Sequence, residues 1–294
     1  MELNGDGKAD ILSGCYSEHQ PMAGLFWLLA GTGDGTVAKA VAVNGSDGKP
    51  LIIPASENEI VKSICTQPAA HDWDGDGDLD ILTGNFEGTF FLFRNEGSKE
   101  KASFNPKPQQ IMAGEQPLKL DGGHSGVCAV DWDGDGDADI LTGSARGGAF
   151  LAENKSSGKG VVQFSPFREL LGPASGSADE DAAPPLKAPL PTNPGNNTRV
   201  WAADVNGDKR LDLLIGDSAR LTARAEGVSE EEFRKRQTSW QKEMSDLREQ
   251  MSKPRADGTP APPEVSRNYS KLYERRKEFI KEESTGFVWL ALRK

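Results

Sequence analysis

The feature that most constrains this chain is a nine-residue acidic segment that occurs four times and aligns without gaps. The four copies are ELNGDGKAD (2–10), DWDGDGDLD (72–80), DWDGDGDAD (131–139) and DVNGDKRLD (204–212). Each copy runs directly into a short apolar stretch that ends in glycine: ILSG, ILTG, ILTG and LLIG. Repetition of this kind predicts a fold that is built from repeated structural units.

A second apolar stretch that opens with glycine follows each copy: GLFWLLA, GTFFLFRN, GGAFLAEN and GFVWLALR. Each unit is therefore interpreted as strand A, the acidic loop, strand B, a turn, strand C and a more variable strand D. Four short strands in about 60 residues are typical of a β-propeller blade. The prediction is an all-β chain of four-stranded propeller blades, in a single domain over 1–294. The expected blades lie at about 1–60, 61–120, 121–171 and 199–294.

Strand A of the first blade and strand D of the fourth are missing from the sequence pattern, so these two blades are expected to be incomplete. Two explanations stay open. Either the partial blades complete each other, or the chain is part of a larger ring.

The acidic loop has the chemistry of a calcium site. Calcium takes six to eight oxygen ligands, and loop positions 1, 3, 5 and 9 offer side-chain oxygens while position 7 offers its backbone carbonyl. Glycines at positions 4 and 6 allow the positive φ angles that such a tight loop needs. The candidate ligands are Asp72, Asp74, Asp76, Asp78 and Asp80; Asp131, Asp133, Asp135, Asp137 and Asp139; Glu2, Asn4, Asp6, Lys8 and Asp10; and Asp204, Asn206, Asp208, Arg210 and Asp212.

The second and third loops fit calcium best. The first begins with Glu2, and the fourth carries Lys209 where the others have glycine, so we rank the first loop third and the fourth last. An EF-hand would need Glu at position 12, which is absent; magnesium prefers a near-ideal octahedral shell, and zinc would need His or Cys ligands. The alternative is a solvated Asp-Gly turn, above all for the fourth loop.

This pattern resembles the FG-GAP/VCBS repeats of integrin-α-type propellers, whose calcium loops read D-x-[DN]-G-D-G-x-x-D. The resemblance covers nearly the whole chain outside two insertions. It implies a calcium-binding scaffold for binding or adhesion, not an enzyme, with a protein or carbohydrate ligand on the face opposite the calcium loops. The alternative that the resemblance leaves open is a propeller-fold polysaccharide lyase or hydrolase on that same face.

Composition and charge limit the classes of partner that the chain is expected to bind. The formal net charge of −11 argues against a nucleic-acid partner, and no apolar run approaches the roughly 18–20 residues of a membrane span. Three cysteines are too few for a disulfide framework. Extracellular calcium modules bind at about 10⁻⁴–10⁻³ M and would be empty in a resting cytosol, so we expect a secreted, periplasmic or cell-surface protein.

The two insertions are expected on the face opposite the calcium loops. Residues 172–198 are rich in proline and alanine and predict a disordered loop. Residues 217–285 carry two apolar stripes separated by a proline-rich breaker, and they predict a helical hairpin whose first helix is capped by Ser229. Its stripes either pack on each other or form a docking surface for a partner or for self-association with a second copy. His19, with Tyr16 and Glu18, is the one cluster in which acid–base chemistry is plausible.

Overall fold

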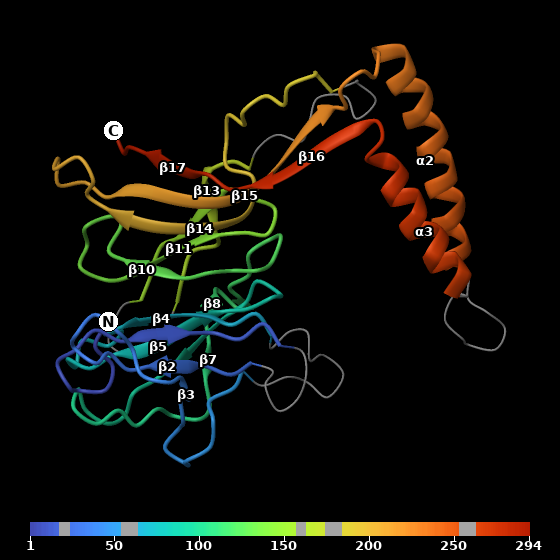
Figure 1. Cartoon of the computed structure of the whole chain (residues 1–294). Coiled ribbons are helices and arrows are strands. Elements are labelled where there is room, and N and C mark those ends of the chain that lie inside the picture. The colour runs from blue at the N-terminus through green and yellow to red at the C-terminus, as the bar shows by residue number, and fades with distance from the viewer. Residues whose placement is uncertain (18–23, 54–63, 157–162, 174–183, 253–262) are drawn as a thin grey trace. The chain divides into compact units, whose positions relative to one another are not determined.

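The computed structural model describes residues 1–17, 24–53, 64–156, 163–173, 184–252 and 263–294 (Figure 1). The chain divides into two compact units, which are considered separately. Unit 1 comprises Met1–Ala174, Asn193–Ser218 and Phe287–Lys294, and unit 2 comprises Ser175–Thr192 and Ala219–Gly286. No helix in the described part of the chain is long and apolar enough to cross a membrane.

Unit 1 contains four antiparallel sheets, one for each predicted blade, which confirms the all-β propeller prediction. Blade 1 consists of β1 (Ile11–Ser13), β2 (Trp27–Leu29) and β3 (Val41–Ala42). Blade 2 consists of β4 (Gln67–His71), β5 (Asp80–Gly84), β6 (Phe90–Phe93) and β7 (Gln109–Gln110), and blade 3 of β10 (Cys128–Val130), β11 (Asp139–Gly143), β12 (Ala149–Ala152) and β13 (Arg168–Leu171). Blade 4 consists of β14 (Asn196–Ala203), β15 (Asp212–Arg224) and β17 (Val288–Ala291). A two-stranded hairpin, β8 (Met112–Ala113) and β9 (Gln116–Pro117), follows blade 2.

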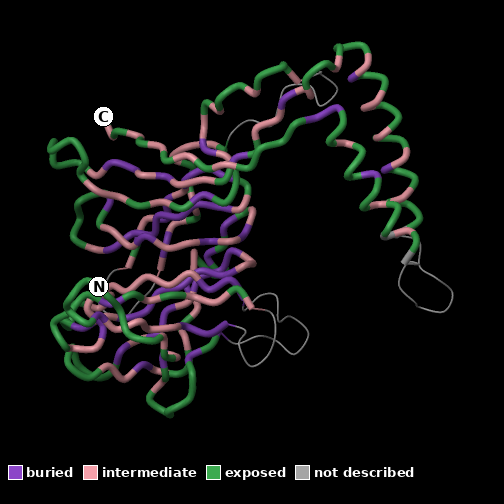
Figure 2. Tube along the Cα trace, in the orientation of Figure 1, coloured by how far each residue is buried: buried purple, intermediate pink, exposed green. Residues whose placement is uncertain are grey.

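The blades are stacked in chain order, with β1 beside β4, β4 beside β10 and β10 beside β14 (Figure 1). Because side chains alternate along a strand, strand B of a middle blade buries one row against the preceding blade and the other row against the following blade. In β5, Ile81 packs towards blade 1 and Leu82 towards blade 3. In β11, Ile140 packs towards blade 2 and Leu141 towards blade 4. All four side chains are at most 1 % exposed, and the buried positions lie within the stack (Figure 2).

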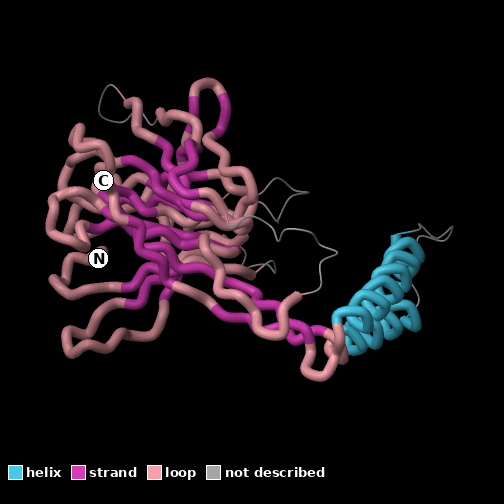
Figure 3. Tube along the Cα trace, turned by 90° about the horizontal axis from the view of Figure 1, so that it is seen from above, coloured by secondary structure: helices cyan, strands magenta, loops and turns pink. Residues whose placement is uncertain are grey.

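Unit 2 contains the predicted helical hairpin. Helix α2 (Glu230–Ser252) and helix α3 (Pro263–Arg276) lie side by side (Figure 3). The Glu232 N–H donates to Ser229 Oγ over 3.1 Å, as the predicted N-cap requires. Trp240 Nε1 donates to the Leu272 carbonyl over 2.8 Å, and the apolar stripes of the two helices pack on each other.

Two details of this insertion differ from the sequence prediction. We predicted that strand B of blade 4 ends at Gly216, but β15 continues to Arg224 and pairs with β16 (Ile280–Thr285), from Ala219↔Thr285 to Arg224↔Ile280. The second apolar stripe of the insertion continues in the sequence to Phe279 and Ile280, but α3 ends at Arg276. Those two side chains are buried beside Phe233 instead, because the chain turns there and enters β16.

The predicted disordered loop is described only in part. Residues 174–183 lie outside the described residues, so the prediction of disorder stays untested there. Further along, the Arg224 N–H donates to the Pro185 carbonyl over 2.9 Å, and β14 begins at Asn196.

Candidate metal centre

The acidic loop of blades 2, 3 and 4 connects strand A to strand B, and the first acidic loop directly precedes strand B of blade 1. In blades 2 to 4, antiparallel pairing brings the last residue of strand A opposite the position-9 aspartate, as in His71↔Asp80. The glycines at positions 4 and 6 have positive φ angles between 69° and 99° in all loops that carry them. Lys209 occupies position 6 of the fourth loop with φ 68°, so its backbone adopts the same conformation without the freedom of glycine.

The position-9 aspartate joins three parts of its blade. In all four blades it is at most 5 % exposed, its Oδ2 accepts the N–H of loop position 2, and its Oδ1 accepts the N–H of the residue two positions beyond strand C. The Oδ2 donors are Leu3, Trp73, Trp132 and Val205 at 2.9–3.2 Å, and the Oδ1 donors are Gly31, Asn95, Asn154 and Arg293 at 2.7–2.9 Å. Asp10, Asp80, Asp139 and Asp212 are therefore structural anchors as well as candidate ligands.

The side chains at positions 1, 3 and 5 shape the loop itself by accepting backbone N–H groups. At position 1, Asp131 accepts from Gly134 and Gly136, at 2.7 and 3.1 Å. At position 5, Asp135 Oδ1 accepts from Asp137 at 3.1 Å. The corresponding position-5 bonds, to Asp6, Asp76 and Asp208, recur in the other loops at 2.9–3.0 Å. These bonds curl the loop so that its carboxylates lie close together.

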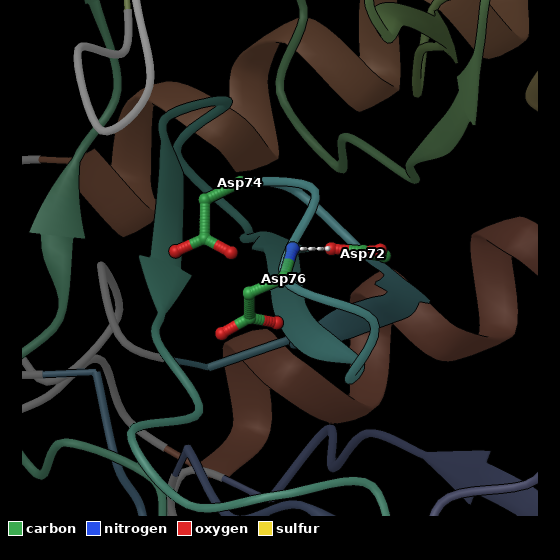
Figure 4. Close-up of side chains that lie close together, drawn as sticks. All are labelled: Asp72, Asp74 and Asp76. Atoms are coloured by element: carbon green, nitrogen blue, oxygen red, sulfur yellow. Dashed lines mark hydrogen bonds between the residues drawn. The ribbon is translucent and has the colours of Figure 1, made fainter.

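Two groups of carboxylates converge closely enough to share a cation. In blade 2, Asp72, Asp74 and Asp76 each offer an oxygen within 4.8 Å of the others (Figure 4). In blade 3, the equivalent group is Asp131, Asp133 and Asp139. Within the described residues, the first and fourth loops contain no such group of three converging acidic side chains, and each has asparagine at position 3.

The side chain at position 7 is a feature that sequence reasoning missed. We predicted that Asp78 and Asp137 act through their carbonyls, but the Oδ1 atom of each carboxylate is buried without a hydrogen-bond partner. Burial and the neighbouring Asp76, Asp74 and Asp72 raise the pKa of Asp78. Burial, followed by Asp135 and Asp139, raises the pKa of Asp137 to about 6. A buried carboxylate oxygen without a partner costs free energy, which a cation would offset. The first and fourth loops have Lys8 and Arg210 at this position. The aspartate at position 7, which follows two Asp-Gly pairs, is the sequence signal that distinguishes the two middle loops from the outer ones.

The two middle loops differ in the charged side chain that follows strand C beside them. Arg94, the residue after β6, places Nη1 2.8 Å from Asp74 Oδ2 and 3.7 Å from Asp80 Oδ2. The equivalent residue of blade 3 is Glu153, whose carboxylate pairs with Lys155 and Arg168. A metal ion in the second loop would therefore compete with a guanidinium, which the third loop does not have at that position.

The predicted acid–base cluster is described only at Tyr16, which is exposed; Glu18 and His19 lie outside the described residues. His71 ends β4, and burial lowers its pKa. His124 has a positive φ of 53° and packs on the Phe86 ring at 4.3 Å, and burial again lowers its pKa.

The comparison with protein families agrees with this geometry. Residues 72–142 match the family model described as an FG-GAP-like repeat, and this range begins at the first candidate ligand of the second loop and includes the whole third loop. No curated protein matches the chain. The repeat match and the stacked blades together define the class: this chain contains a β-propeller scaffold in which residues 72–142 match an FG-GAP-like repeat.

Proposed function

We propose that the acidic loops of blades 2 and 3 bind calcium and that this propeller acts outside the cytoplasm as a binding or adhesion scaffold for a protein or carbohydrate. The observation that supports calcium most strongly is at position 7, where Asp78 and Asp137 bury an unpartnered carboxylate oxygen beside a carboxylate cluster. An acidic cluster alone is common on protein surfaces. A buried oxygen without a partner beside such a cluster is unfavourable unless a cation balances it.

The residues fit a hard cation with oxygen ligands. Asp72, Asp74, Asp76 and Asp78 would hold it in the second loop. In the third loop the holders would be Asp131, Asp133, Asp137 and Asp139. Bound calcium would supply positive charge that offsets the repulsion between these carboxylates. The protein's own side chains would still curl the loop and anchor it to strand C through the position-9 aspartate.

The extracytoplasmic location and the ligand class form the second part of the proposal. Calcium loops of extracellular modules fill at the concentrations found outside cells. FG-GAP-like repeats are typical of such scaffolds, which supports a binding role rather than an enzymatic one. The ligand surface is proposed on the face opposite the loops.

The test is unfolding of the 294-residue chain in calcium, in EGTA, and in magnesium as the control for a nonspecific divalent effect. Calcium should raise Tm, with a stabilisation of about 2.7 kcal/mol for each site when its concentration is 100 times the Kd. The double variant Asp131→Asn with Asp133→Asn should lose a large part of this shift. The matched variant Asp204→Asn with Asp208→Asn should lose little. A Tm that calcium does not change would overturn the metal assignment.

A further inference from the structure

The outward face of blade 4 carries apolar side chains that the preceding blades bury. Directly paired residues of neighbouring strands point to the same side of a sheet. In blade 4, Trp201 of β14 pairs with Leu214 of β15, which pairs with Leu290 of β17. These three side chains therefore form one row, named here the open row of blade 4.

The equivalent row of each preceding blade packs against the blade that follows it. In blade 3 the row is Cys128–Leu141–Leu151, and all three belong to the cluster shared with blade 4. In blade 2, Leu82 and Leu92 of the row face blade 3. Leu92, Leu141 and Leu151 are fully buried, whereas Trp201 is 64 % and Leu290 50 % exposed. The neighbouring Val288, which corresponds to the fully buried Ala149 and Phe90, is also exposed.

Blade 1 presents the other half of the same interface. Its row on the side away from blade 2 contains Ile11, paired with Leu29. At the position of Ile11, the other blades have Ile81, Ile140 and Leu213, which are at most 5 % exposed against the preceding blade. Ile11 itself is 51 % exposed. Unit 1 thus forms the same blade-to-blade contact three times and carries both halves of it unpaired at its two outer blades.

We propose that the open row of blade 4 packs against the Ile11 row of blade 1 in a second copy of this chain. The contact would continue the series of blade-to-blade contacts, with apolar rows on both sides. Propellers usually close with four to eight blades, so two four-bladed copies joined head to tail at both outer faces would complete an eight-bladed ring. This inference is independent of calcium binding, and it places self-association on the blades rather than on the helical hairpin.

The experiment measures the mass of the 294-residue chain by light scattering and sedimentation across a concentration series. The expected result is a dimer of twice the 31.6 kDa of one chain. The double variant Trp201→Glu with Leu290→Glu should raise the dimer dissociation constant at least about tenfold, as expected for apolar anchors at the centre of an interface. The single variant Ile11→Glu should do the same from the other side. Because these side chains are exposed in one copy, each variant should keep the circular dichroism and unfolding midpoint of the parent monomer.

Leu190→Glu provides the control, because Leu190 is an exposed leucine of unit 2, and its change should leave the dimer intact. A chain that stays monomeric at every concentration would overturn the proposal and indicate that another occupant covers the row. A dimer that resists the Trp201 and Leu290 changes, or one that Ile11→Glu leaves intact, would also overturn it. A dimer that Ile11→Glu leaves intact would point to a symmetric contact between two blade-4 faces. Growth beyond two copies would exclude the closed ring.

Discussion

The two middle blades and the two outer blades are built from the same repeat, but they make different use of it. Blades 2 and 3 bury both rows of strand B, and each brings three carboxylates of its loop within 4.8 Å of one another. Blades 1 and 4 carry exposed apolar side chains on the side away from their one neighbouring blade, such as Ile11 and Leu290. Their loops have asparagine at position 3 and a cationic residue at position 7. The repeat therefore specifies the shape of a blade, while its neighbours and a few substitutions specify what the blade contributes.

The largest expected effect compares one side-chain position in a middle and an outer blade. Leu151→Ala should destabilise the chain by about 2–5 kcal/mol, because it opens a cavity in a fully buried row. Leu290→Ala, the matched change in blade 4, should cost less than about 1 kcal/mol in the monomer because half of that side chain is already exposed. Denaturant unfolding at a concentration that keeps the chain monomeric measures both. Equal losses of stability in the two variants would show that the outer face of blade 4 is covered in solution.

The second prediction concerns the anchor that all four blades share. Asp139→Ala should cost about 2 kcal/mol or more without calcium, since it leaves the N–H groups of Trp132 and Asn154 without their acceptor. Asp212→Ala should cost a similar amount, because Asp212 accepts the equivalent pair of N–H groups and is fully buried. Unfolding in EGTA separates this structural role from metal binding. A loss of stability that is seen only in calcium would show that the aspartate acts as a metal ligand and not as a structural anchor.

The third prediction uses the one loop residue with a strained backbone. Lys209→Gly should stabilise the fourth loop by about 1 kcal/mol, because glycine adopts φ 68° without the steric cost of a Cβ atom. The reverse change in the third loop, Gly136→Lys, should destabilise by a similar amount, since a Cβ atom at Gly136 has free space and only the φ of 96° opposes it. Unfolding curves of both variants in EGTA test this prediction. The changes in the free energy of unfolding must have opposite signs in the two variants.

The smallest expected effect distinguishes the two middle loops. Arg94→Gln should strengthen calcium binding by the second loop by up to about fivefold, because it removes a guanidinium that competes for Asp74. The matched change Glu153→Gln is made beside the third loop and should leave the second loop unaffected. Calorimetric titration in the Asp131→Asn, Asp133→Asn background isolates the second loop. Weaker binding in the Arg94 variant would show that the guanidinium supports the loop in its metal-bound form.

The parts of the fold that depend on residues close together in the chain could be predicted from the sequence. The spacing of aspartate and glycine predicted the loops, and the positive φ angles at positions 4 and 6 agree because only local backbone geometry is involved. The two apolar stretches that follow each loop predicted the blades, and the Ser229 cap and apolar stripes predicted the helical hairpin.

The parts that failed or were missed depend on residues far apart in the chain. The extension of β15 to Arg224 required a partner strand more than 50 residues away, since an edge gains its hydrogen bonds only by pairing. The burial of the Asp78 carboxylate and the approach of Arg94 to Asp74 arise only when the loop folds against strand C.

The sequence by itself thus determined the repeat, the class of fold and the set of residues that are able to hold a cation, because each follows from the identity and spacing of nearby side chains. Only the tertiary structure decided which carboxylates converge, which one is left without a partner, and which apolar row lies buried or exposed. These outcomes depend on packing between blades, and the same Ile or Leu in the same local pattern is fully buried where a neighbouring blade covers it and half exposed where none does.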